Sequence, residues 1–119
     1  MSPAKSIEVL LEDIKENQEI KNVTLVSRSG MHIAGEVPKN SHRETFVAMS
    51  AILLGSAETA TSELEDELSY VLVELKNSRI LILNSGPSAI LVTKLVSDSN
   101  IDEIIDYLED PIKDIQESL

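Results

Sequence analysis

The sequence contains no cysteine and no tryptophan, and its aromatic residues are one phenylalanine and two tyrosines. Without thiols, the chain has neither disulfides nor thiolate metal ligands. No apolar run approaches the roughly 20 residues that span a bilayer. Acidic residues also interrupt the first 18 positions, unlike the apolar core of a signal peptide. We therefore expect a cytoplasmic protein with no membrane insertion and no bound metal or cofactor.

Basic residues are scarce, with 10 lysines and arginines against 21 aspartates and glutamates and a formal net charge of −11. Such a chain repels phosphate backbones and gains nothing from counterion release, so we expect no nucleic-acid partner. Many of the acids lie in the last 22 residues. They form either a solvated helix face or a negative surface that attracts a basic partner.

The length of 119 residues corresponds to one domain, and 42% apolar residues suffice for one core. We expect residues 1–119 to form a single α/β domain. Periodicity and turn residues predict its elements in order. They are a helix at 5–18, strands at 23–26 and 31–34, a helix from 42 to 64, strands at 70–75, 80–83 and 89–96, and a helix from 101 with a kink at Pro111.

The connections between these strands are short and polar, which is typical of hairpins. The order α-β-β-α-β-β-β-α therefore predicts a five-stranded antiparallel sheet between helices. The last three strands are apolar almost continuously, which indicates that helices cover both faces. Ser41 and Glu44 have the spacing of a capping box for the middle helix, and Ser99 or Asn100 is expected to cap the last.

The middle helix has no charged residue from Phe46 to Ala57. Its strongest apolar stripe is expected to lie on the sheet and comprises Phe46, Met49, Leu53, Ala57, Ala60 and Leu64. Ala48, Ala51 and Gly55 form a strip of small residues along which a second helix could approach. The glycine costs about 1 kcal/mol relative to alanine inside a helix. Either these small residues serve internal packing, or the helix pairs with a second copy, which we favour.

The strand at 70–75 begins a three-strand meander and is expected at a sheet edge. An apolar edge without proline or lysine runs invites aggregation unless something covers it. Pairing of this edge across a two-fold axis removes that hazard. A homodimer thus explains both the strand and the middle helix, and Tyr70, Leu72 and Glu74 are the strand residues predicted at its interface.

The segments Val23–Ala34, Phe46–Ala57 and Gly86–Val92 together resemble the roadblock family, which includes the dynein roadblock light chain and a bacterial regulator of a gliding-polarity GTPase. The resemblance implies a roadblock/profilin-like fold with the middle helix on one face and the terminal helices on the other. It also implies a homodimer that binds a Ras-like small GTPase as a scaffold or regulator and is not itself an enzyme. The implied contact residues on the middle helix are Val47, Ala48, Ala51, Ile52, Leu54, Gly55 and Glu58.

Candidate catalytic groups are few. His32 and His42 are expected at the surface, and no recognisable motif surrounds either one. Arg43 is positioned near the contact helix, but we expect no arginine finger there. The alternative class is a small-molecule sensor of the PAS or GAF type, which has similar size and layering. A sensor requires a cavity lined by large side chains, and three aromatic residues supply few of them.

Overall fold

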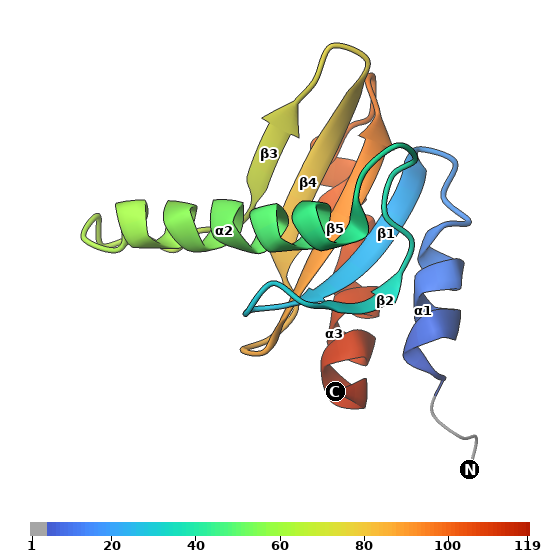
Figure 1. Ribbon diagram of the computed structural model, residues 1–119, viewed down its shortest axis with the longest axis horizontal. Helices are drawn as coiled ribbons and strands as arrows, with labels where there is room; N and C mark the ends of the chain where they lie inside the picture. Colours follow the sequence, from blue (N-terminus) through green and yellow to red (C-terminus); the bar gives the residue numbers. More distant parts are fainter. Residues whose placement is uncertain (1–4) are drawn as a thin grey trace.

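One five-stranded antiparallel sheet with helices on both faces forms the fold in the computed structural model, which describes residues 5–119 (Figure 1). The elements, in order, are α1 (Ile7–Ile14), β1 (Ile20–Ser27), β2 (His32–Gly35), α2 (Arg43–Thr61), β3 (Val71–Glu74), β4 (Ser78–Asn84), β5 (Ala89–Val96) and α3 (Ile101–Ser118). This order confirms the predicted fold class. Residues 1–4, which the predicted domain includes, lie outside the described residues.

The strands are arranged in the order β2-β1-β5-β4-β3, and every neighbouring pair is antiparallel. The three predicted hairpins are present, and β1 and β5, far apart in sequence, pair at the centre of the sheet. The sheet edges are therefore β2 and β3. The prediction that the strand near residues 70–75 lies at an edge is confirmed.

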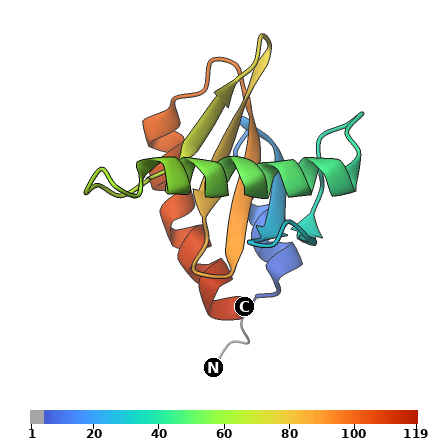
Figure 2. The same ribbon diagram turned by 60° about the vertical axis from the view of Figure 1, so that its left-hand side comes forward.

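Helices α1 and α3 pack on one face of the sheet, and α2 crosses the other (Figure 2). Because both faces are covered, the central strands are buried along most of their length. In β5 six of the eight residues are buried. Leu91 belongs to the cluster under α1 and α3, and its neighbour Val92 belongs to the cluster under α2. This alternation explains the continuous apolar sequence of the strand.

The terminal helices are fixed by local caps and by each other. The backbone N–H of Glu103 donates to the Asn100 side chain at 3.1 Å, which confirms one of the two predicted caps of α3. The Tyr107 hydroxyl donates to the carbonyls of Asp13 and Ile14 at 3.2 Å and so holds the end of α1 against α3. The α3 helix continues through Pro111 to Ser118.

The predicted capping box at the start of α2 is wrong. His42 is the N-cap residue and its side chain makes no capping hydrogen bond. The Ser41 hydroxyl instead donates to the Pro38 carbonyl at 2.5 Å, because that residue belongs to the preceding turn. The helix also ends at Thr61 rather than Leu64, since the chain turns there and Glu65 adopts a positive φ of 55°.

The prediction that the strongest apolar stripe of α2 lies on the sheet is also wrong. The buried residues of the helix are Val47, Ser50, Ala51 and Leu54. From the predicted stripe, Met49 is 50% exposed, Leu53 is 45% exposed and Leu64 is also exposed. The sheet instead contacts the arc of Val47, Ala51 and Leu54, and from the predicted stripe Phe46 packs against the same cluster. The hydroxyl of buried Ser50 is satisfied by the Phe46 carbonyl at 2.8 Å.

Candidate functional site

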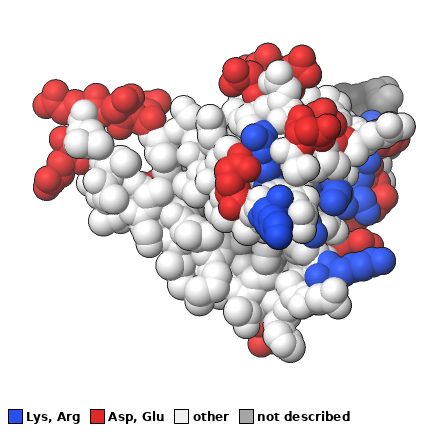
Figure 3. Space-filling view, turned by 90° about the horizontal axis from the view of Figure 1, so that it is seen from above, with Lys and Arg blue, Asp and Glu red and all other residues white. Residues whose placement is uncertain are grey.

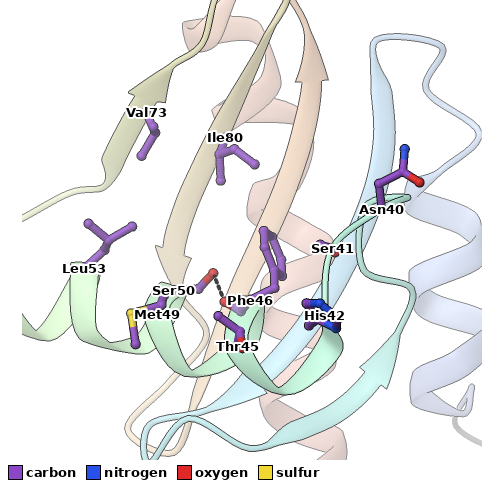
Figure 4. Close-up of a pocket in the computed structure, with 10 residues that line it drawn as sticks. All are labelled: Asn40, Ser41, His42, Thr45, Phe46, Met49, Ser50, Leu53, Val73 and Ile80. Carbon is purple, nitrogen blue, oxygen red and sulfur yellow. Dashed lines mark hydrogen bonds between the residues drawn. The ribbon is translucent and has the colours of Figure 1, made fainter.

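An open apolar groove runs between the first half of α2 and the strands β3 and β4 (Figure 4). Its volume is about 400 Å³. Phe46, Met49 and Leu53 contribute from the helix, and Val73 and Ile80 contribute from the strands. The remaining lining residues are Asn40, Ser41, His42, Thr45 and Ser50. In Figure 4 Leu53 points toward Val73 across the hollow. Two members of the predicted sheet-facing stripe, Met49 and Leu53, therefore line this groove with half-exposed side chains.

The edge strand β3 borders this groove. It pairs with β4 on one side, and no strand among residues 5–119 pairs with its other side. Alternation along the strand turns Val71 and Val73 toward α2, whereas Tyr70 and Leu72 pack toward α1 and α3. Glu74 is exposed, and its Oε1 lies 2.7 Å from Arg79 Nε. Of the predicted strand residues, Tyr70 and Leu72 thus lie on the face away from the groove, whereas Val71 and Val73, which the sequence did not single out, lie on the face of α2.

The predicted contact residues of α2 divide into two groups. Val47, Ala51 and Leu54 are buried against the chain's own sheet, so their prediction as a free contact surface is corrected. Ile52 is 54% exposed and Gly55 is partly exposed, with no atom within 4 Å of the position that a Cβ would occupy.

Ala48 lies against the turn between β1 and β2. A Cβ on Gly30 in that turn would come within 3.2 Å of the Ala48 Cα. Internal packing therefore accounts for the small residue at position 48, which was one of the two interpretations that the sequence left open. It does not account for Gly55, which faces open space.

The last predicted contact residue on α2, Glu58, lies in a polar cluster. The Arg28 guanidinium donates to both Glu58 and Asn84, and Asn84 Nδ2 donates to Glu58 Oε2 at 3.2 Å. Arg28 belongs to the turn after β1 and Asn84 ends β4, so this cluster connects two strand ends to the second half of α2. It holds the helix in place beside the groove.

The cluster also sets the ionisation of its carboxylate. The hydrogen bond from Arg28 lowers the pKa of Glu58 from its ordinary value of 4.5, and the hydrogen bond from Asn84 lowers it further, while burial opposes both. A lowered pKa means that the pair stabilises the fold above about pH 4.5. This stabilisation is lost as the pH falls through the lowered value.

Arg28→Ala is expected to reduce the free energy of unfolding at pH 7 by about 0.5–1 kcal/mol, because both charged side chains are about one-third exposed. The difference from the unmodified chain should disappear as the pH falls through the lowered pKa of Glu58. Urea denaturation at several pH values measures both effects. Lys113→Ala removes the more exposed Lys113–Glu109 pair and is the control with no expected loss. A loss for Arg28→Ala that grew on acidification would contradict this assignment.

The two histidines lie on different elements. A ring nitrogen of His32, Nε2, is 2.7 Å from the Gly35 carbonyl within the short strand β2, whereas His42 lies at the rim of the groove. Among residues 5–119, no three histidine, cysteine, aspartate or glutamate side chains gather as metal ligands would. Within the same residues, no helix combines the length and apolarity needed to cross a membrane.

Charged side chains avoid a broad part of the surface around α2. In Figure 3 a wide uncoloured area extends from the projecting acidic end of the molecule toward the body. The described chain thus combines a five-stranded sheet between helices with an apolar groove at one edge. An exposed apolar patch next to an unpaired strand is typical of a surface that contacts another protein. The fold and this groove define a small protein-interaction module.

The comparison with known families agrees. Residues 6–94 match the Roadblock/LC7 domain, and the chain belongs to this family. A relative from Methanocaldococcus jannaschii, described as an uncharacterized protein, is 25% identical over 87 residues, which are 72% of this chain and 74% of the relative. The resemblance inferred from the sequence is thereby confirmed.

Solved structures show the same fold. A Roadblock/LC7 domain from Streptomyces avermitilis has a TM-score of 0.83 at 12% identity and covers 95% of this chain and 97% of its own. MglB from Myxococcus xanthus has a TM-score of 0.82 at 13% identity, with 93% and 92% of the two chains covered. Identities this low establish the architecture alone.

Proposed function

We propose that this chain is a non-catalytic homodimeric interaction module whose dimer binds a Ras-like small GTPase as a scaffold or regulator. The observation that carries the proposal is the groove formed by Phe46, Met49 and Leu53 beside the edge strand β3. Met49 and Leu53 are half exposed, and apolar side chains of this size next to an unpaired strand are stabilised when a partner covers them.

A second copy of the chain covers both features at once. Two β3 edges related by a two-fold axis extend the sheet across the dimer, and the two α2 helices cover each other's apolar side chains. The description of one MglB structure as a tetrameric arrangement supports self-association as a property of that protein. For this chain the homodimer remains our proposal.

Membership of the Roadblock/LC7 family supports the proposal of a GTPase partner. The roadblock resemblance implies such a partner, and Ile52 and Gly55 lie on a side of α2 that the groove does not use. A shallow surface of Ile52, Gly55, Ser56, Thr59 and Ala60 runs along this side. It stays accessible when the groove is covered, so it is the surface on which we place the GTPase.

The first experiment measures the mass of the purified protein by light scattering. A homodimer has twice the chain mass of 13.1 kDa, or 26.2 kDa. We then expect the dimer to bind at least one Ras-like GTPase of the source organism, loaded with GDP or with a non-hydrolysable GTP analogue. Ile52→Asp should abolish this binding without changing the mass. A particle of 13.1 kDa at about 100 µM chain, well above a typical micromolar dissociation constant, would contradict the homodimer.

The alternative of a small-molecule sensor is tested in the same preparation. A sensor site encloses most of its ligand, whereas this groove opens at the surface between a helix and a strand edge. A bound metabolite retained through purification, with no GTPase binding, would favour the sensor over the interaction module.

A further inference from the structure

The two edges of the sheet are built differently. No strand among residues 5–119 pairs with the outer side of β2 or of β3 (Figure 1). The register of β2 on β1 shifts, because Leu25 pairs with Ala34 whereas the next residue, Val26, pairs with His32. Ile33 therefore has no partner of its own on β1. Such an extra residue is a β-bulge, which bends and twists an edge strand away from the regular geometry that a further strand requires.

The carbonyl group of Gly35 faces the outside of the sheet and is already occupied. The backbone N–H of Glu36 donates to the Val23 carbonyl on β1 at 3.2 Å. In a trans peptide the N–H and the C=O point in opposite directions, so the Gly35 carbonyl, which shares this peptide unit, points away from β1. The His32 side chain lies along the edge and places Nε2 2.7 Å from the Gly35 oxygen. Because a carbonyl oxygen only accepts, Nε2 donates this hydrogen bond.

The strand β2 also ends directly after this carbonyl. Gly35 has a positive φ of 83°, which turns the chain out of the extended conformation. The Thr24 hydroxyl donates to the Glu36 carbonyl at 2.7 Å and holds the turned segment against β1. Pro38 follows and has no N–H to offer a neighbouring strand. The edge is thus confined to His32–Gly35, where one residue is bulged and one outward carbonyl is occupied.

The strand β3 has an unmodified edge. Its pairing with β4 runs from Val71 to Glu74 without a register shift, and the strand contains no proline. Among residues 5–119, every residue with a positive φ lies outside β3. The described sheet therefore has one regular edge and one edge that carries several of the features by which proteins prevent strand addition.

We infer that His32 and the Ile33 bulge close β2 to strand pairing, so that strand addition between copies is confined to β3. In the proposed homodimer, which joins two β3 edges, the two β2 edges lie at the ends of the combined sheet. If these ends were open, each would accept a further copy and the assembly would continue as a filament. The closure of β2 does not depend on the homodimer, whereas the limit of two copies rests on it.

Replacement of His32 in the full chain tests this role. His32→Val removes the hydrogen bond to Gly35 and supplies a side chain that strands favour. His32→Gln is the conservative variant, because its amide N–H has a reach similar to that of Nε2 and retains the bond. Met31→Val is the second control, since it adds the same side chain at an exposed neighbouring position and leaves His32 in place.

Light scattering should show growth for His32→Val alone. At about 1 mM chain, where contacts with a millimolar dissociation constant are populated, we expect a weight-average mass about twice that of the natural chain. The increase should reverse on dilution, and the two controls should keep the natural mass. Hydrogen exchange should locate the new contact, with amide protection over residues 32–36 that rises with concentration in His32→Val. If circular dichroism shows that His32→Val does not fold, His32→Ala makes the same comparison with a smaller side chain.

Two results would overturn the inference. One is a folded His32→Val chain that keeps the natural mass at this concentration. The other is a His32→Gln chain that associates as strongly as His32→Val, since the hydrogen bond would then not be what closes the edge. A natural chain that remains monomeric contradicts the homodimer instead, and the variants are still compared with the natural mass.

Discussion

Leu53→Asp is expected to weaken self-association at least a hundredfold and to leave a folded monomer of 13.1 kDa. Leu53 is 45% exposed and lies in the groove rather than in either core cluster. The substitution therefore removes little core packing. In a covered apolar interface, however, an unpaired carboxylate must be desolvated, which costs several kcal/mol. A hundredfold change corresponds to about 2.7 kcal/mol.

The matched control is Thr59→Asp, which adds the same charge to an exposed position of the same helix on the side of Gly55. Sedimentation equilibrium should show a monomer for Leu53→Asp and a dimer for Thr59→Asp, with far-ultraviolet circular dichroism alike for both. If Thr59→Asp dissociated the dimer and Leu53→Asp did not, the interface would lie on the strip of small residues. The proposed groove would then be wrong.

The fold could be predicted from the sequence because each element carries its own local signal. The apolar runs of β4 and β5 have the length of strands and are bounded by turn residues, and the Asn100 cap precedes a clear helical period. Their pairing follows from short connections. The long-range pairing of β1 with β5 has no local signal, and the sequence did not predict it.

The orientation of α2 could not be predicted, since the helix has two apolar arcs. Hydrophobicity alone favoured the arc of Met49 and Leu53, which contains the larger side chains. The sheet instead packs against Val47, Ala51 and Leu54. Close approach of the β1–β2 turn at Gly30 requires small residues on the helix beside it, and this contact joins segments 18 residues apart. Helical periodicity contains no information about such a contact.

The same error explains the misassigned site residues. Once the Met49 arc was placed on the sheet, the other arc was left for a partner, and Val47 and Leu54 were predicted as contact residues. A rotation of the helix about its axis accounts for the difference on α2. On β3, the predicted residues Tyr70 and Leu72 lie on the face of α1 and α3, whereas Val71 and Val73 share a face with α2. The polar cluster of Arg28, Glu58 and Asn84 was missed because its members come from three separate elements.

Gly35→Ala is expected to reduce the free energy of unfolding by about 2–4 kcal/mol, the largest stability effect of those considered for this chain. Gly35 ends the edge strand β2 with a φ of +83°, a conformation that alanine adopts only with strain. A Cβ there would also lie 2.3 Å from the Val23 carbonyl oxygen and 3.0 Å from a methyl group of Leu11. The carbonyl belongs to the backbone of β1 and cannot move without disturbing the sheet.

Gly55→Ala is the control that makes this prediction specific. The same methyl group is added, but Gly55 has ordinary helical geometry and open space around it, so alanine should stabilise the helix by up to about 1 kcal/mol. Urea denaturation of the two variants measures both free-energy changes. A loss below about 0.5 kcal/mol for Gly35→Ala would contradict the close contact, because changes of that size are typical of neutral surface substitutions. Because Gly55 lies outside the groove, its variant should also dimerise as the natural chain does. A weakened Gly55→Ala dimer with unchanged stability would place a second helix against that glycine and move the interface there.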